Sequence, residues 1–439
     1  AVGYSALGDV VDSSDHTAVG FEAQKVDCGS ESTAFGFKAA RSNHSIRLVA
    51  LGPFAGQNNN SWPNMFVGYN AGGTSSDITG SNITGVGYNA LKSVTSGSNN
   101  TALGNEALAL NTTGENNVAV GHVALDANTT GSSLTAVGSG ALDANTTGNS
   151  NTAVGKACLD ANTTGGANTA IGKDALSSNT TGSNNVAVGE DALEDNTTAS
   201  ENTAVGARAL RENTTGNLNN AFGRAAMQLC TTGTDNSAFG YISGQNITSG
   251  NSNACFGNGS GNDITTGGNN VCIGVNAGRG TSPSGTINTG SNNVVLGNNS
   301  ISNLFCADTS ISSSDSRDKT DISDFTKGLS WIEALRPVTY RWDRRTWYGT
   351  DEQPYGTPDG SKKRARLHVG FLAQEALEVE KANGYGTSND DSLVLNLTED
   401  GMSYGMKYER LVPMLVNAIK ELSAKNTALE TRVAALEAA

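Results

Sequence analysis

The residue types that could carry out covalent chemistry gather in one string, which runs from Ser312 to Ile322 and reads SSSDSRDKTDI. In this string Ser314 stands five residues before Lys319. A serine hydroxyl is inert until a neighbouring group takes its proton, and a lysine can do so at neutral pH only where burial lowers its pKa. A Ser-Asp pair in front of a helix is more often an N-cap. Spacing alone therefore leaves a structural and a nucleophilic interpretation open.

The string lies where the composition of the 439-residue chain changes. Residues 1–313 carry 11 Lys+Arg and 22 Asp+Glu, whereas residues 314–439, although much shorter, carry 17 and 20. Of the 54 glycines, 45 lie in the first part. A single core rarely exceeds about 250–300 residues, so a chain of this length is expected to contain more than one structural unit. The first part is an array of low diversity, and the second has the composition of a globular domain.

The first part repeats itself. A glycine preceded by Val, Ile, Leu or Phe recurs every 17 residues from Gly87 to Gly274, and the best-kept unit, at 202–218, reads NTAVGxxALxxNTTGxx. One unit is too short to fold alone, so each unit is predicted to form one coil of a β-solenoid, with Val and Leu filling a thin core and Gly at the corner. The Asn-Thr-Thr segments, which also read as glycosylation sequons, are interpreted as ladders of side-chain hydrogen bonds between coils.

The repeats resemble the left-handed β-roll heads of trimeric autotransporter adhesins and similar repeats in phage tail fibres. The resemblance covers residues 1–300 and implies a mainly β fold, a homotrimeric β-solenoid (β-roll) shaft of 17-residue repeats.

Two further motifs in the repeats are interpreted as structural. The segment 143–148 looks like the start of a calcium loop, but Val154 stands where the bidentate Glu belongs, so no metal is expected. Cys255 and Cys272 should stack on neighbouring coils, where buried thiols are favoured over a disulfide.

The second part resembles the C-terminal intramolecular chaperone of the endosialidase type, the self-cleaving trimerisation domain of many phage tail spikes and fibres. The string supplies an SDxRxK motif, with Asp315 and Arg317 as its supporting residues. Three more landmarks follow in family order, and they are Leu335–Trp342, Gly370–Glu375 and Tyr408–Pro413. The resemblance covers residues 312–439.

This resemblance implies autoproteolysis by a Ser-Lys dyad, with Ser314 as nucleophile and Lys319 as general base. The scissile bond would join Ser313 to Ser314, and the domain would act as an endopeptidase once, in cis. Asp318 departs from the apolar residue that the family often has there. His368, which has no second candidate partner, is expected to be structural.

The C-terminal segment 410–439 is predicted to be a coiled-coil helix. Lys425 with Glu430, and Arg432 with Glu437, have the five-residue offset that pairs neighbouring chains in parallel. Val and Ile at the first heptad position with Leu at the second favour a dimer in simple coiled coils, whereas both resemblances imply a trimer. The residues expected to form the trimer contact occupy these two positions: Val412, Leu415, Ile419, Leu422, Asn426, Leu429, Val433 and Leu436.

The expected domains are the solenoid at 1–300, a junction at 301–313 and a small α+β chaperone at 314–439. Together they predict a viral tail fibre or spike for host attachment, whose chaperone drives trimerisation and then cuts itself off. The expected partners are two further copies of the chain and a host cell-surface receptor, either a glycan or a protein. The expected location is the virion, after assembly in the host cytoplasm. The chain begins within a repeat, so we expect a preceding attachment region.

Composition also argues against several functions. A net charge of −14 disfavours nucleic-acid binding, and no apolar run approaches the roughly 20 residues that membrane insertion needs. No cofactor is expected. Two alternatives remain, a bacterial trimeric surface adhesin without enzymatic activity and a glycan-degrading tail spike. The second would need paired carboxylates in a groove, whereas acidic residues such as Asp160 occupy variable positions of the repeat.

Overall fold

The computed structural model describes residues 1–9, 14–26, 30–44, 46–73, 77–301, 322–349, 353, 356–388, 391–397 and 404–438. These residues form two compact units. The first unit comprises Ala1–Ala277 and Asn288–Leu296, and the second comprises Gly278–Ile287 and Gly297–Ala439.

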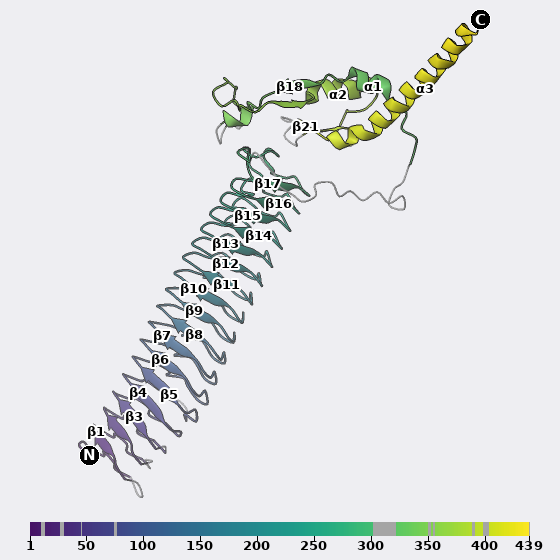
Figure 1. The fold of residues 1–439 in the computed structure, drawn as a ribbon. Helices are drawn as coiled ribbons and strands as arrows, with labels where there is room; N and C mark the ends of the chain where they lie inside the picture. Colours follow the sequence, from purple (N-terminus) through teal and green to yellow (C-terminus); the bar gives the residue numbers. More distant parts are fainter. Residues whose placement is uncertain are drawn as a thin grey trace. The chain divides into compact units, whose positions relative to one another are not determined.

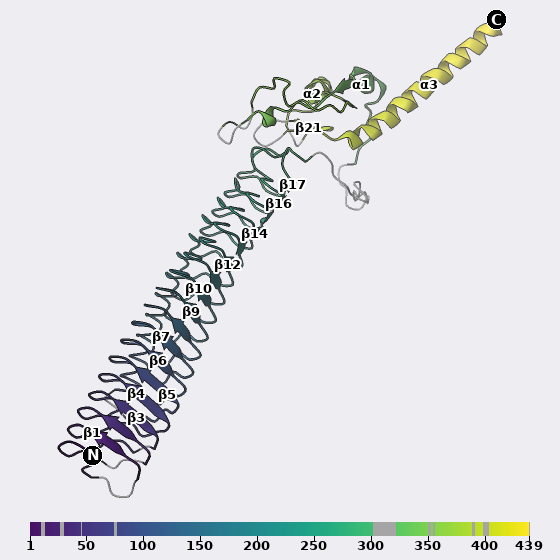
Figure 2. The same ribbon diagram turned by 60° about the vertical axis from the view of Figure 1, so that its left-hand side comes forward.

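The first unit is a parallel β-solenoid, as predicted (Figures 1 and 2). Each coil contributes one short strand, and each strand pairs with the next at the equivalent repeat position, as in Ala153 opposite Ala170. The 17 strands are β1 (Thr17–Val19), β2 (Thr33–Phe35), β3 (Leu48–Leu51), β4 (Asn64–Val67), β5 (Ile83–Val86), β6 (Thr101–Leu103), β7 (Val118–Val120), β8 (Thr135–Val137), β9 (Thr152–Val154), β10 (Thr169–Ile171), β11 (Val186–Val188), β12 (Thr203–Val205), β13 (Asn220–Phe222), β14 (Ser237–Phe239), β15 (Ala254–Phe256), β16 (Val271–Ile273) and β17 (Val294–Leu296).

The core of the solenoid differs from the prediction in one respect. Leu159 is buried as expected, but the inward residue of its coil's strand is Ala153, and Val154 is 36% exposed. A three-residue strand points only its middle side chain to one face, because successive residues of a strand alternate. The thin core is therefore built from alanine and leucine, and the prediction that the valines fill it is wrong.

The corner glycine is required by both conformation and space. Gly121 has φ +143°, and a Cβ on it would overlap the backbone carbonyl oxygen of Gly138 in the next coil. A second corner uses a residue that the sequence did not reveal as special, since Leu125 has φ +54°. This conformation costs an L-residue about 1–2 kcal/mol. The cost is offset because the Leu125 side chain is buried and its N–H donates to the Ala141 carbonyl at 3.0 Å.

Buried asparagines tie the coils together, which confirms the predicted ladders. In one column, Asn151 donates to the Gly165 carbonyl at 2.8 Å and accepts the N–H of Asn168 at 2.9 Å. A second column contains the Asn of each Asn-Thr-Thr segment, and Asn128 donates to Asn111 Oδ1 at 2.7 Å. These asparagines are fully buried in the folded coils. Hydrogen bonding inside the solenoid thus explains why these asparagines recur at the same position of each repeat.

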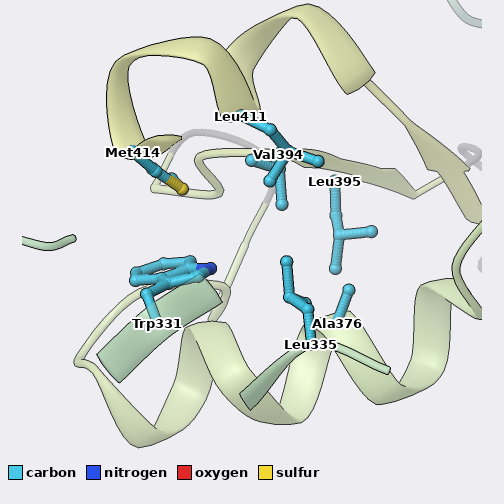
Figure 3. Packing of buried hydrophobic residues seen from close by; sticks show 7 residues of the cluster. All are labelled: Trp331, Leu335, Ala376, Val394, Leu395, Leu411 and Met414. Carbon is cyan, nitrogen blue, oxygen red and sulfur yellow. The ribbon is translucent and has the colours of Figure 1, made fainter. Parts of the chain in front are cut away.

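The second unit is a small α+β arrangement. Its elements are α1 (Leu329–Ala334), β18 (Val338–Tyr340), η2 (Arg345–Trp347), β19 (His368–Gly370), α2 (Ala373–Ala382), β20 (Leu395–Leu397), β21 (Tyr404–Met406), η3 (Tyr408–Arg410) and α3 (Leu411–Glu437). β18 pairs antiparallel with β19, and β20 pairs antiparallel with β21. The core lies between α1, α2 and the start of α3 (Figure 3). It consists of Trp331, Leu335, Ala376, Val394, Leu395, Leu411 and Met414.

Candidate functional site

The predicted processing residues lie outside the described residues. They are Ser313, Ser314, Asp315, Arg317 and Lys319, and the described chain resumes at residue 322. The described residues of this part of the chain begin at Ile322 and include the three landmarks that follow the string.

An ion pair joins the first two landmarks. Arg336, between α1 and β18, donates through Nε to Glu375 Oε2 at 3.1 Å, and its Nη2 contacts Glu375 Oε1. The hydrogen bond from Arg336 lowers the pKa of the Glu375 carboxyl, and the carboxylate raises the pKa of the guanidinium in turn. Both side chains are substantially exposed, so the pair contributes little stability. Its bidentate geometry instead fixes how the segment before β18 meets the first turn of α2.

The third landmark contacts the second through Tyr408. The Tyr408 hydroxyl accepts the N–H of Phe371 at 3.2 Å. A Cβ on Gly370 would lie 2.6 Å from the same hydroxyl, so only glycine leaves room for this contact. The sequence could order the three landmarks along the chain, and the structure shows that they meet in space.

Glu380 is a buried carboxylate that the sequence analysis missed. It is fully buried in α2, accepts the N–H of Val394 at 2.5 Å and accepts the hydroxyl of Ser392 at 2.8 Å. These bonds hold the segment before β20 against the helix. A glutamate in a helix is usually expected to be exposed. The sequence signal for burial of Glu380 is its position four residues after Ala376, which places both residues on the same face of α2.

Helix α3 presents two different faces. Leu411, Met414 and Ala418 are buried. The predicted trimer residues lie on a separate stripe, which we call the heptad stripe, and its apolar members are 43–71% exposed in the single chain. Asn426, on this stripe, donates to Glu430 Oε1 at 2.9 Å. The apolar members are Val412, Leu415, Ile419, Leu422, Leu429, Val433 and Leu436.

Aromatic and basic side chains near β19 contact one another. The imidazole of His368 stacks on the ring of Tyr340, with 5.6 Å between ring centroids. The basic run at 362–366 rests partly on aromatic rings, because the Arg364 guanidinium lies 5.0 Å from the Trp347 ring centroid. Such cation–π contacts order basic side chains that are otherwise exposed.

The four cysteines among the described solenoid residues are free thiols. Cys255 and Cys272 occupy paired positions of β15 and β16, and both are buried and are not joined by a disulfide, as predicted. In the described part of the chain, no group of three or more His, Cys, Asp or Glu side chains is arranged to hold a metal ion. Of the helices described, none combines the length and apolarity needed to cross a membrane.

Comparison with known families places a recognised domain over this unit. Residues 314–385 match the family described as chaperone of endosialidase. This range begins at Ser314 and includes the Arg336–Glu375 pair, whereas α3 lies beyond it. No curated protein and no solved structure matches the chain. The C-terminal part of the chain is thus similar to the chaperone of endosialidase over residues 314–385, and a parallel β-solenoid precedes this match in the sequence.

Proposed function

We propose that this chain is the subunit of a homotrimeric viral tail fibre or spike, and that its C-terminal chaperone assembles the trimer and then cuts itself off at Ser313–Ser314. The observation that carries the proposal is the order of the parts. The match to a self-cleaving chaperone family begins at Ser314, shortly after the last solenoid strand ends at Leu296.

An exposed apolar column along the solenoid supports self-association. The residue before the corner glycine is apolar in every coil, and many of these side chains are exposed. Monomeric proteins rarely expose a continuous apolar strip of this extent. Another copy of the chain, aligned in parallel, presents the same residues at the same coil spacing. The most exposed members are Val2, Phe35, Leu51, Leu103, Val154, Ile171, Phe239, Phe256, Ile273 and Leu296.

The heptad stripe supports a parallel arrangement from the other end of the chain. Its apolar side chains are exposed in the single chain, as expected for a helix that packs against copies of itself. Coils that resemble one another can pair out of register, so a trimer seed at one end would fix the register before the solenoids associate. Removal of the seed would then make assembly irreversible.

The proposed cleavage needs only groups from this chain and water. Neutral Lys319 takes the proton of Ser314 Oγ, and the oxygen attacks the carbonyl carbon of Ser313. The C–N bond breaks as the proton passes to the nitrogen of Ser314, which leaves an ester between the two residues. Water hydrolyses this ester to give a carboxylate on Ser313 and a free hydroxyl and amine on Ser314. Burial of Lys319 on trimer assembly would lower its pKa and keep it neutral.

Intact-mass measurement of the freshly made full chain tests the cleavage. The wild-type chain should give two fragments that meet at Ser313–Ser314, and Ser314→Ala and Lys319→Ala should give a single uncut chain. Ser316→Ala is the matched control and should be cut normally. A Ser314→Ala chain that still appears as two fragments would falsify the proposal.

The fibre would attach the virion to its host through a cell-surface glycan or protein, after assembly in the host cytoplasm. Binding of the purified solenoid trimer to susceptible and resistant host cells tests this part. Equal binding to both would argue against host recognition by the described coils.

A further inference from the structure

A cavity of about 300 Å³ in the second unit has no part in the proposed function. It lies beside the two segments that continue the β18–β19 pair beyond its last rung, where the Arg364 N–H donates to the Trp342 carbonyl at 2.8 Å. Residues two apart along an extended segment project to the same face. Trp342 and Arg344 therefore line the cavity from one segment. Arg364 and Arg366 line it from the other.

The lining of this cavity is positively charged. It contains three guanidinium groups, and the described residues that line it include no aspartate or glutamate. Burial lowers the pKa of the Arg344 guanidinium and the nearby charge of Arg364 lowers it further, while Tyr340 opposes both effects. The positive charges therefore converge without a counter-charge from the residues of the lining.

Two buried donors at the cavity have no acceptor. Asn299 is only 8% exposed, and its Oδ1 accepts a hydrogen bond from Arg344 Nη1 at 3.2 Å. Its backbone carbonyl accepts the indole N–H of Trp347 at 3.3 Å. The remaining Asn299 Nδ2 and Arg344 Nε are buried and find no acceptor among the described residues. Buried polar groups are rarely left unpaired in native structures, so these two donors indicate a ligand that supplies acceptors.

Two tryptophan rings hold the guanidinium groups in place. Arg344 lies 4.3 Å from the ring centroid of Trp342, and Arg364 lies 5.0 Å from that of Trp347. Stacking orients a guanidinium and leaves the N–H groups at its edge available, and this planar edge matches a carboxylate or phosphate group. The cavity volume is at the lower end of the range of about 300–1,000 Å³ for small-molecule sites. Its size and its donors therefore suit a small anion.

We propose that this cavity binds a small molecule through an oxyanion, either a carboxylate or a phosphate group. The oxyanion accepts the hydrogen bonds of Arg344 Nε and Asn299 Nδ2, and Arg364 and Arg366 balance its charge. The site goes beyond the proposed function, and it does not depend on whether the chain cuts itself.

The test uses the full-length Ser314→Ala chain, which keeps Asn299 and Arg344 on one polypeptide whether or not the wild-type chain is cut. Malonate and inorganic phosphate are titrated separately at constant ionic strength, with chloride as the reference anion. Calorimetry and tryptophan fluorescence follow binding, because Trp342 and Trp347 line the cavity. At least one of the two probes should bind saturably. The probe that binds more tightly identifies the oxyanion as carboxylate or phosphate.

Three substitutions at the cavity and one control then locate the binding. Arg344→Gln should raise the Kd of the bound probe at least about tenfold, and Arg344→Lys should also raise it, because lysine keeps the charge and lacks Nε. Arg366→Gln changes an exposed side chain and should raise the Kd without unfolding the chain, so it decides the test if Arg344→Gln does not fold. The matched control is Lys363→Gln, which removes an exposed charge from the same segment outside the lining and should leave the Kd within about twofold of the parent chain.

Three results would overturn the inference. The first is the absence of saturable binding of both probes by heat and by fluorescence. The second is an unchanged Kd in the folded Arg344→Gln chain, or in Arg366→Gln where that variant decides. The third is a loss of affinity in Lys363→Gln as large as that in the cavity variants, since it would show that the anion responds only to the overall charge of the segment.

Discussion

Asn162 donates its Nδ2 to Asn145 Oδ1, one coil away, at 2.8 Å, and the same nitrogen donates to the Gly165 carbonyl at 3.0 Å. Its own Oδ1 accepts from Asn179 in the following coil at 2.8 Å. Each buried amide therefore closes a turn within its coil and joins that coil to both neighbours. A core this thin has few apolar contacts, so these hydrogen bonds carry much of the specificity of stacking.

Asn162→Ala should lower the free energy of unfolding by about 1–3 kcal/mol, because it removes the donor to Asn145 and the acceptor for Asn179 inside the core. Chemical denaturation monitored by circular dichroism measures the loss. Thr164→Ala, at an exposed position two residues on, is the control and should change stability little. Equal stability of the two variants would show that the amide column is dispensable.

Gly121→Ala should prevent normal stacking of its coil, because its Cβ would overlap the carbonyl oxygen of Gly138 at a backbone conformation that L-residues rarely adopt. We expect loss of the soluble folded chain or a strongly lowered melting temperature. Gly140→Ala is the matched control. A Cβ there meets nothing closer than 3.8 Å, and Val123 and Ala157 already adopt positive φ at the equivalent positions. Similar melting temperatures for both variants would contradict the steric argument.

Ionisation of Asp143 should make the solenoid less stable at pH 7 than in mild acid, where its carboxyl is protonated. Burial raises the pKa of its carboxyl, and the neighbouring carboxylates of Asp160 and Asp126 raise it further, while His122 opposes them. Since the folded state holds its proton more tightly than the unfolded state, ionisation above the folded pKa destabilises the fold. Asp143→Asn should raise the melting temperature by about 2 °C at pH 7, and the gain should shrink as the pH falls through the folded pKa.

The control for this prediction is Asp235→Asn, which removes one charge at an exposed position. A gain from Asp143→Asn that is equal at pH 7 and pH 4, or equal to that of the control, would contradict the role of burial.

The thiol of Cys158 should resist alkylation in the folded chain. Burial raises its pKa to about 12, so almost no thiolate is present at pH 8, and the side chain is inaccessible. Iodoacetamide should therefore leave Cys158 unmodified in the native protein and modify it after denaturation, as judged by peptide mass. Rapid modification of the native protein would show that its coil opens readily.

Ile419→Asp should prevent trimer formation, because it places a charge within the heptad stripe. Sedimentation equilibrium of the full chain should then give a monomer. Ala424→Asp introduces the same charge at an exposed position of α3 outside the stripe and should leave the oligomer intact. A trimeric Ile419→Asp chain would place the interface elsewhere.

The solenoid could be predicted from the sequence because the 17-residue repeat recurs in many copies. An error about one residue within a copy does not change the repeat length. The sequence could not show which side chains point inward. Val154 and Ala153 are both apolar, and only the pleat of a three-residue strand assigns the alanine to the core. The positive φ of Leu125 could not be predicted either, because leucine rarely adopts this backbone conformation.

In the second unit, the landmarks and the helix with its heptad stripe were predictable from local pattern, whereas the buried face of α3 was not. The bond between Tyr408 and Phe371 and the burial of Glu380 were not, because they depend on segments distant in sequence. The assignment of Ser314 and Lys319 stays a prediction, since both lie outside the described residues.

Because each coil pairs with its neighbours in the same way, the length of the solenoid is set by the number of its coils. Coil 152–168 meets its neighbours through the same groups as coil 169–185, as the pairing of Ala153 with Ala170 and of Ala170 with Ala187 shows. Excising or duplicating one such block of 17 residues would reunite equivalent partners at the splice. The length of the solenoid can therefore change in steps of about 4.8 Å, the spacing of one strand, and no new type of contact between coils is needed.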